Sequence, residues 1–220
     1  MFNGVYNANI PLRNLNMRLI KYFKAVKILY RSISHLVDME EIKDIDAFYQ
    51  EQRARYPSVM GSKTLDLGCG TKPRNPFAAE AAFGIDIADV GIPNIVQSDL
   101  SQSPIPFENG SMDYITAFDF IEHVPRVIYL PSIRLSFIEL MNEIHRVLKP
   151  GGIFLAQTPV YPFSACFTDP THVNPVTSET FSLYFDDQRK WGAMYGFKGS
   201  FCIQRQVLFS THLLTVLQKT

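Results

Sequence analysis

The sequence lacks the features that mark several classes of protein. It has three cysteines, Cys69, Cys166 and Cys202, whose odd number and spacing fit neither a disulfide framework nor a metal-binding motif. No segment approaches the roughly 20 consecutive apolar residues that span a bilayer, and the first residues carry no signal-peptide pattern. We therefore expect a soluble, reduced, cytoplasmic protein.

The sequence also lacks a net charge, because 21 Lys and Arg side chains balance 21 Asp and Glu side chains. Proteins that bind nucleic acids usually have a basic excess that neutralises phosphates, so this balance argues against a nucleic-acid partner. A chain of 220 residues can bury a sizeable core as one domain with an appendage.

The charges are unevenly distributed near the N-terminus, where bases occur without an acid. Apolar residues recur there at alternating steps of three and four from Leu12 to Leu36, which predicts one helix with an apolar stripe. Three roles fit its basic face: a cap over the domain with solvated charges, a peripheral contact with an anionic membrane, or contact with a phosphorylated substrate. The bases are Arg13, Arg18, Lys21, Lys24, Lys27 and Arg31.

The remaining chain alternates between strand-like and helical segments, which predicts an α/β fold with a doubly wound, mostly parallel sheet. A helix is expected over Leu135–Leu148, and two strands joined at Ser210-Thr211 predict a C-terminal antiparallel hairpin. We expect residues 1–60 to form an N-terminal helical extension and residues 61–220 the main domain. The seven predicted strands are Thr64–Leu67, Phe83–Ile87, Asn94–Gln97, Met112–Phe118, Gly152–Thr158, Ser200–Phe209 and His212–Gln218.

The most informative segment is Thr64–Thr71, which reads TLDLGCGT. It combines a short apolar strand, an acid at Asp66 and two glycines in a turn where backbone can approach a ligand closely. Such a turn at the carboxyl edge of a parallel sheet commonly binds a cofactor that contains a nucleoside. A dinucleotide-binding turn would need a third glycine at the position of Pro73, so the dinucleotide fingerprint fails.

This octapeptide resembles motif I of the class I S-adenosylmethionine (SAM)-dependent methyltransferases, whose pattern is hydrophobic-hydrophobic-Asp-x-Gly-x-Gly. Four later segments resemble the family in the same order, and the resemblance runs from about Lys63 to the end of the chain. It implies a Rossmann-like methyltransferase fold and SAM as the cofactor. The later segments are FGIDI, QSDLSQSPIPF, FENGSMDYITAFDFIEHVP and EIHRVLKPGGIFLAQTP.

The resemblance also implies which residues bind SAM. Asp86 would accept hydrogen bonds from both ribose hydroxyls, and Asp99 would accept one from the adenine amine, with Leu100 as an apolar wall and backbone donor. The implied cofactor residues are Asp66, Gly68, Cys69, Gly70, Asp86, Ile87, Asp99, Leu100 and Phe118.

The sequence departs from the family between motif I and Asp86, where a full helix usually lies. Two prolines in Lys72–Pro76 restrict the start of a helix, so we expect a short one. The side chains of Lys72 and Arg74 either pair with the cofactor carboxylate or are solvated.

Two polar clusters follow the fourth and fifth predicted strands, Asp119–His123 and Thr168–His172. His123 or His172 could act as a general base or bind the acceptor, and Asp169 could orient His172. The first cluster also resembles the metal-binding segment of ubiquinone-biosynthesis O-methyltransferases and of plant small-RNA 2′-O-methyltransferases. That resemblance implies Mg²⁺, Mn²⁺ or Zn²⁺ bound by Asp119, Glu122, His123 and His172, although many metal-free members of the fold also contain Glu-His-Val-Pro.

The resemblance therefore implies a methyltransferase that uses SAM to methylate a hydroxyl group of a small molecule or a saccharide. The stretch Asp169–Pro175 favours the saccharide, since it resembles a segment of methyltransferases from surface-polysaccharide synthesis. One alternative is a metal-assisted O-methyltransferase acting on RNA or on a quinone precursor. Another is a non-catalytic SAM-binding scaffold, in which an eroded glycine turn would be expected.

Overall fold

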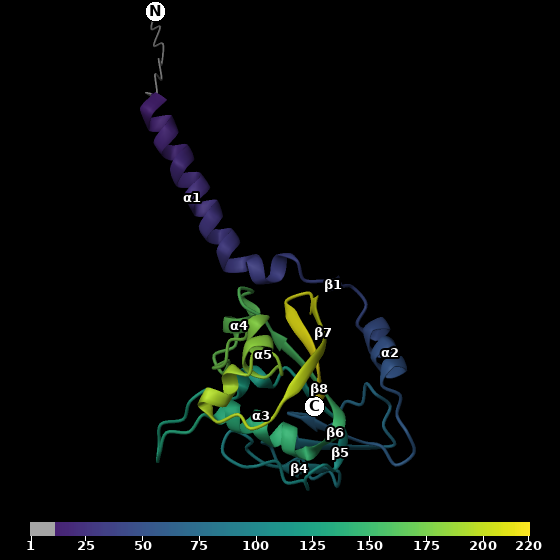
Figure 1. The fold of residues 1–220 in the computed structure, drawn as a ribbon. Coiled ribbons are helices and arrows are strands. Elements are labelled where there is room, and N and C mark those ends of the chain that lie inside the picture. The colour runs from purple at the N-terminus through teal and green to yellow at the C-terminus, as the bar shows by residue number, and fades with distance from the viewer. Residues whose placement is uncertain (1–11) are drawn as a thin grey trace, which may run out of the picture. The chain divides into compact units, whose positions relative to one another are not determined.

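The computed structural model describes residues 12–220, with residues 12–16 described by their backbone alone. The chain divides into two compact units, Met1–Asp38 and Met39–Thr220. The second unit contains a twisted sheet with helices around it (Figure 1). Within the described part of the chain, no helix combines the length and apolar character needed to cross a membrane.

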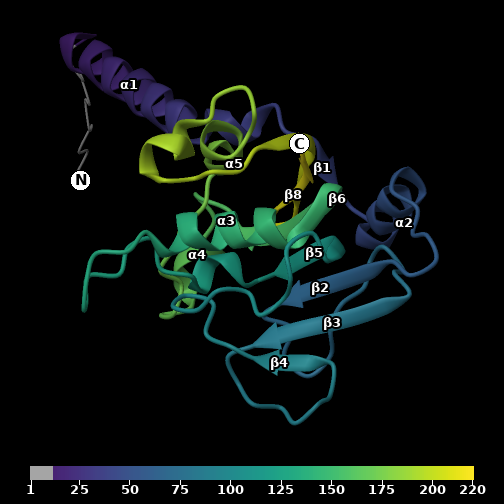
Figure 2. The same cartoon turned by 60° about the horizontal axis from the view of Figure 1, so that its bottom comes forward.

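The second unit is organised around an eight-stranded sheet in the order β1-β7-β8-β6-β5-β2-β3-β4. All pairs are parallel except those that β8 makes with β6 and β7, which confirms the predicted mostly parallel sheet with a C-terminal hairpin (Figure 2). The seven expected strands are present, and β1 is an additional short one. The strands are β1 (Glu41–Ile42), β2 (Lys63–Leu67), β3 (Ala81–Asp86), β4 (Ile95–Gln97), β5 (Met112–Phe118), β6 (Leu148–Pro159), β7 (Phe201–Phe209) and β8 (His212–Lys219).

Helices complete this unit on both faces of the sheet. The helix expected over Leu135–Leu148 is present as α3 (Ser136–Val147), which leads directly into β6. On the opposite face, α2 (Ile45–Arg55) begins at Asp44, whose carboxylate caps the N–H groups of Asp46 and Ala47. The shorter helices are η1 (Ile121–His123), α4 (Ala165–Thr168), α5 (Glu179–Tyr184) and η2 (Trp191–Tyr195).

The division into units differs from the expected boundary at residue 60. Residues 39–60 belong to the sheet unit, because β1 pairs with β7 and Phe48 of α2 is 3% exposed within the core of the sheet. The sequence pattern of α2 is weakly amphipathic, and only Phe48 and Gln52 of this helix are buried, so the pattern alone does not indicate that α2 packs on the sheet.

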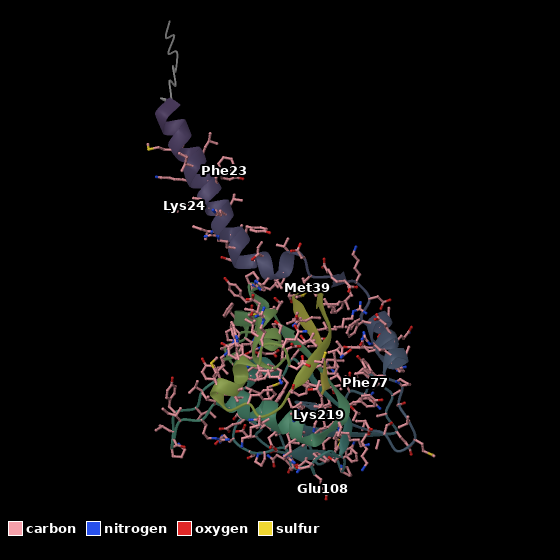
Figure 3. The ribbon with its side chains drawn as sticks, in the orientation of Figure 1. Phe23, Lys24, Met39, Phe77, Glu108 and Lys219 are labelled. Atoms are coloured by element: carbon pink, nitrogen blue, oxygen red, sulfur yellow. The ribbon has the colours of Figure 1, made fainter. Side chains whose placement is uncertain are left out.

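The first unit contains α1 (Leu12–Val37), a helix of 26 residues that matches the predicted apolar stripe. Phe23 belongs to the apolar side of this helix and Lys24 to the basic side, and the two extend from different sides of it (Figure 3). The orientation of α1 relative to the sheet unit is not determined, so the expected cap remains a prediction.

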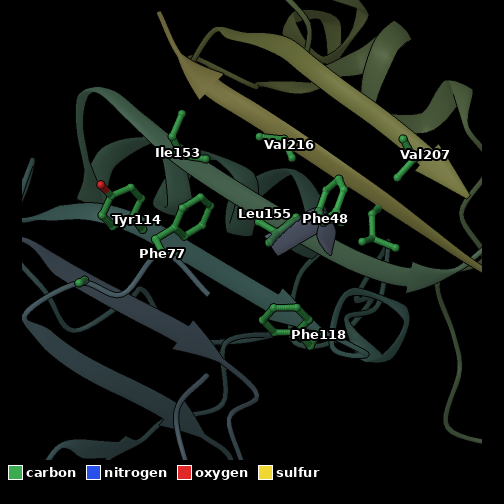
Figure 4. Packing of buried hydrophobic residues seen from close by; sticks show 10 residues of the cluster. Phe48, Phe77, Tyr114, Phe118, Ile153, Leu155, Val207 and Val216 are labelled. Carbon is green, nitrogen blue, oxygen red and sulfur yellow. The ribbon is translucent and has the colours of Figure 1, made fainter. Parts of the chain in front are cut away.

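No helix lies between β2 and β3, so the expectation of a short helix there is wrong. Pro73 and Pro76 fix the backbone at two points, and the segment runs as turns and extended chain. Phe77 takes over part of the packing that a helix would provide: its fully buried ring stacks on Tyr114 of β5, with ring centroids 4.5 Å apart (Figure 4).

We predict that Phe77→Ala destabilises the protein by about 3–5 kcal/mol, because the truncation leaves a cavity between the loop and β5. Ile133→Ala, at a side chain that is 72% exposed, is the matched control and should change the free energy of unfolding by less than about 0.5 kcal/mol. Urea unfolding followed by circular dichroism measures both. Similar values for the two variants would show that Phe77 does not anchor the loop.

Candidate functional site

The candidate site is a cavity of about 510 Å³ at the carboxyl edge of β2, β3, β4 and β5. The ends of these parallel strands meet at one edge of the sheet, so residues distant in sequence converge there. Five of the nine predicted cofactor residues line the cavity: Gly68, Asp86, Ile87, Asp99 and Leu100. The cavity is completed by Ile85, Ser98, Ser101, Asp119, Phe120, His123, Val124, Pro125 and Thr171.

The glycine turn forms one wall of this cavity. The backbone N–H groups of Gly68 and Cys69 both donate to the Ile85 carbonyl oxygen, at 2.8 and 3.1 Å, which fixes the turn on β3. Gly68 has a φ of +69°, and a Cβ there would lie 2.6 Å from Cδ2 of Phe120. Only glycine therefore fits at this position.

Two acids present carboxylates along the cavity wall. Asp86 Oδ2 accepts from the N–H of Gly70 at 2.8 Å, and Oδ1 accepts from the N–H of Ala88 at 3.0 Å. Asp99 Oδ1 accepts from the N–H and hydroxyl of Ser101. Burial acts to raise the pKa of Asp99, but the hydrogen bonds from Ser101 and Gln102 outweigh it and hold the pKa below its usual value. Both carboxylates are therefore held in fixed orientations.

The other four predicted cofactor residues lie outside the cavity lining. Asp66 is 2% exposed and supports the turn from beneath: Oδ1 accepts from the Thr116 hydroxyl at 2.7 Å, and Oδ2 from the N–H of Arg74 at 2.8 Å. Burial raises the pKa of Asp66 to about 6, against the effect of these two bonds. Gly70 contributes through its bond to Asp86, Cys69 contributes through its N–H bond to Ile85, and Phe118 belongs to the core cluster of the sheet.

Arg74 and Lys72 behave differently from each other. The Arg74 guanidinium lies over the Phe118 ring, 4.6 Å from its centroid, in a cation–π arrangement. Lys72 is exposed to solvent. Both side chains are exposed at the surface, and a pairing of either with the cofactor carboxylate stays a prediction.

A cluster of Glu122, His123 and His172 lies beside this cavity, of which His123 is a lining residue. One ligand atom from each side chain lies within 4.8 Å of the others, and the two imidazole rings meet edge-to-face at 4.7 Å. Glu122 is 2% exposed: Oε2 accepts from the Thr158 hydroxyl at 2.9 Å, whereas Oε1 is buried without a hydrogen-bond partner among the described residues. Burial raises the pKa of Glu122 above its usual value.

Hydrogen bonds at Nδ1 orient both imidazoles. His172 Nδ1 lies 3.0 Å from the Ala165 carbonyl oxygen, which can only accept, so this nitrogen carries the proton. The Thr171 hydroxyl donates to Asp169 at 2.6 Å and lies 3.0 Å from His123 Nδ1, so it accepts from that nitrogen. In both neutral rings Nε2 then keeps its lone pair.

Asp169 therefore acts on a different histidine from the one expected. Its carboxylate bonds Thr171, and through Thr171 it orients His123 rather than His172. These bonds from Thr171 hold the pKa of Asp169 below its usual value.

Three of the four expected metal ligands, Glu122, His123 and His172, lie together, and Asp119 is not part of this group. Asp119 Oδ1 lies 3.2 Å from His212 Nε2, and its backbone has a left-handed φ of +51° that turns the side chain away. His212 begins β8 and pairs with Pro159 of β6, so only the strand order brings it here. His212 and Phe120 were not among the predicted site residues, and the position of Phe120 two residues after the end of β5 was the available signal.

The family profile described as "Methyltransferase domain" matches residues 41–197. A demethylmenaquinone methyltransferase of Staphylococcus epidermidis is 26% identical over 182 residues, covering 73% of this chain and 66% of its own length. That of Geobacillus stearothermophilus is 28% identical over 111 residues, covering 42% of this chain and 43% of its own length. The matched part of the chain thus spans less than two thirds of these relatives.

Solved structures support the fold. A complex between the Haloferax volcanii Trm112 methyltransferase activator and a methyltransferase matches with a TM-score of 0.51 at 15% identity, covering 80% of this chain and 98% of that one. The [4+2]-cyclase SpnF matches with a TM-score of 0.50 at 14% identity, covering 88% of this chain and 94% of that one. At these identities the likeness establishes the architecture alone.

We predict that Asp66 makes stability depend on pH. The pKa of Asp66 in the folded protein, about 6, lies above the ordinary value of 3.8. Protonation of Asp66 therefore stabilises the folded state fully below about pH 4, and this stabilisation is lost as the pH rises through 6. Relative to Asp66→Asn, the free energy of unfolding of the wild type should fall by roughly 2–3 kcal/mol between pH 4 and pH 7, at ~1.36 kcal/mol per pKa unit. Urea unfolding of both proteins across this range tests it, and a constant difference would contradict it.

Proposed function

The chain belongs to the methyltransferase-domain family of class I SAM-dependent enzymes, and we propose that it methylates a hydroxyl group of a small molecule or a saccharide. The observation that carries this proposal is the pair of imidazoles beside the cavity, each with Nδ1 bonded and Nε2 left as a base. The scaffold alternative predicted an eroded glycine turn, whereas Gly68 and both wall acids are intact.

The residues of the cavity fit SAM. A cavity of about 510 Å³ lies within the ~300–1,000 Å³ range of small-molecule sites. Asp86 and Asp99 provide oriented carboxylates for ribose hydroxyls and an adenine amine, and Gly68 lets the ligand approach the backbone. When bound, SAM supplies a methyl group on a positively charged sulfur.

The work of the protein is then to position the acceptor and to receive its proton. The methyl carbon forms a bond to the acceptor oxygen as its bond to sulfur breaks, and the hydroxyl proton must leave. Nε2 of His123 or His172 can accept this proton, and the imidazolium can release it to solvent. The Asp169–Thr171 pair keeps His123 in the tautomer that this role requires.

A second candidate is the metal-assisted version of the same reaction, favoured by the unpartnered Oε1 of Glu122. Glu122, His123 and His172 would hold a divalent cation, which lowers the pKa of a coordinated hydroxyl. A quinone precursor is the acceptor to test first in this case, because the similar proteins from Staphylococcus epidermidis and Geobacillus stearothermophilus are demethylmenaquinone methyltransferases. The zero net charge argues against RNA.

We predict that Asp86→Asn weakens SAM binding by about 10- to 100-fold, because the ribose hydroxyls lose a charged acceptor. Asp89→Asn removes an exposed acid three residues away that does not line the cavity and should leave affinity within about twofold. Isothermal titration with SAM and with its demethylated product measures both. No binding to the wild type at millimolar ligand would reject every function proposed above.

We predict that His172→Ala lowers turnover by about 100-fold or more without weakening SAM binding, because the base is lost but the cofactor wall is intact. The acceptor is first identified by screening hydroxylated saccharides, phenols and quinone precursors with labelled SAM. An unchanged turnover number in the variant would refute a role for His172.

The purified wild type and a Glu122→Gln variant distinguish the reaction with an imidazole base from the metal-assisted reaction. If a cation is bound, elemental analysis finds about one equivalent in the wild type and none in Glu122→Gln, and a chelator removes activity. Full activity after chelation, with no bound metal, would eliminate the metal-assisted candidate and leave the imidazole base.

A further inference from the structure

The apolar stripe of α1 has no partner within its own unit. In the described part of Met1–Asp38, α1 is the single helix and no strand accompanies it. Leu19, Phe23 and Leu29 are 46%, 66% and 60% exposed. An amphipathic helix of this length is stable when its apolar face is covered, so a binding partner is expected.

The charge of α1 restricts what that partner can be. Between residues 12 and 37 there is no acidic side chain, whereas Arg18, Lys21, Lys24, Lys27 and Arg31 are exposed bases. At 100° per residue, Lys24 and Arg31 lie opposite the stripe together with the exposed apolar residues Ile20 and Ile28. Lys21 and Lys27 flank the stripe on its two sides, and Arg18 lies at its border. The partner must therefore be apolar where it meets the stripe and anionic at its edge.

Aromatic side chains make the apolar face of α1 broader than the stripe formed by the steps of three and four. Tyr22 lies within the stripe, while Phe23 and Tyr30 extend it on one side, and the rings of Tyr22 and Phe23 meet edge-to-face at 6.0 Å. Tyrosine combines an apolar ring with a polar hydroxyl, which suits the boundary between lipid chains and headgroups. Phe23 and Lys24 are neighbours in the sequence, and they place an apolar ring and a basic side chain on different sides of α1 (Figure 3).

We propose that α1 binds in the plane of an anionic membrane surface, with its apolar face among the acyl chains and its bases at the lipid phosphates. Helices with this distribution of apolar and basic residues bind the interface by burying apolar area and by attracting anionic headgroups. The methyltransferase unit is thereby attached to a lipid surface.

A second copy of the chain is the competing partner, because the steps of three and four from Leu19 to Leu36 also fit a coiled coil. Coiled coils usually place opposite charges beside the seam, where they form ion pairs between helices. Two copies of α1 would bring together bases alone, whereas a membrane supplies the missing negative charges.

The experiment is co-sedimentation of the full chain with vesicles of phosphatidylglycerol and phosphatidylcholine, and with pure phosphatidylcholine vesicles. We expect strong binding to the anionic vesicles, weakened at high salt, and at least about 10-fold weaker binding to the neutral ones. Lys21→Gln/Lys24→Gln/Lys27→Gln should weaken anionic binding by about 10-fold or more. Phe23→Glu should weaken it as well, because it places a charge on the apolar face.

The matched control removes three exposed bases from the other unit, as Arg189→Gln/Lys190→Gln/Lys198→Gln, and should bind like the wild type. SAM titration shows whether each variant is folded. Equal binding by the α1 variants and the control would overturn the proposal, as would no binding of the wild type to anionic vesicles. A dimer in sedimentation equilibrium that Phe23→Glu dissociates, without vesicle binding, would assign the face to a second copy.

Discussion

The buried carboxylate of Asp66 joins the parts of the domain on which the site depends. It accepts from Thr116 on β5 and from the backbone of Arg74 in the loop after the glycine turn. Because no helix follows the turn, the loop has no internal ladder of hydrogen bonds to fix it. The Asp66 bonds and the stacking of Phe77 on Tyr114 provide that order, at the cost of a carboxylate that ionises less readily.

One short segment, residues 118–123, connects the glycine turn at Gly68 with the cluster of Glu122, His123 and His172. Phe120 packs on Gly68, so the segment after β5 lies directly against the cofactor turn. Asp119 adopts a left-handed backbone that non-glycine residues rarely occupy, and its carboxylate meets His212 from β8. Three and four residues after Asp119, the chain places Glu122 and His123 beside the cavity. A change in this segment would therefore disturb both the glycine turn and the Glu122–His123 cluster, to which the proposed function assigns cofactor and acceptor.

The sequence pattern predicted what depends on local chemistry. The positions of the strands along the chain and the glycine turn follow from apolar runs that end in glycine or polar residues, and the resemblance to the family indicated Asp86 and Asp99. The pairing of Asp119 with His212 could not be predicted, because the two residues meet only through the register of β8 on β6. The absence of a helix after the turn is an intermediate case. Pro73 and Pro76 predicted a short helix, whereas the packing of Phe77 against Tyr114, which takes over part of that helix's role, depends on tertiary contacts.

The zero net charge of the chain conceals two oppositely charged parts. The first 38 residues contain six bases and one acid, so the remainder carries five more acids than bases. An acidic domain is repelled by nucleic-acid phosphates, which strengthens the argument against RNA as the acceptor. It is also repelled by an anionic membrane, so the attraction proposed for α1 has to come from α1 itself. Under the proposed binding of α1, the separation of charge would keep the methyltransferase domain in the aqueous phase while α1 contacts the lipid surface.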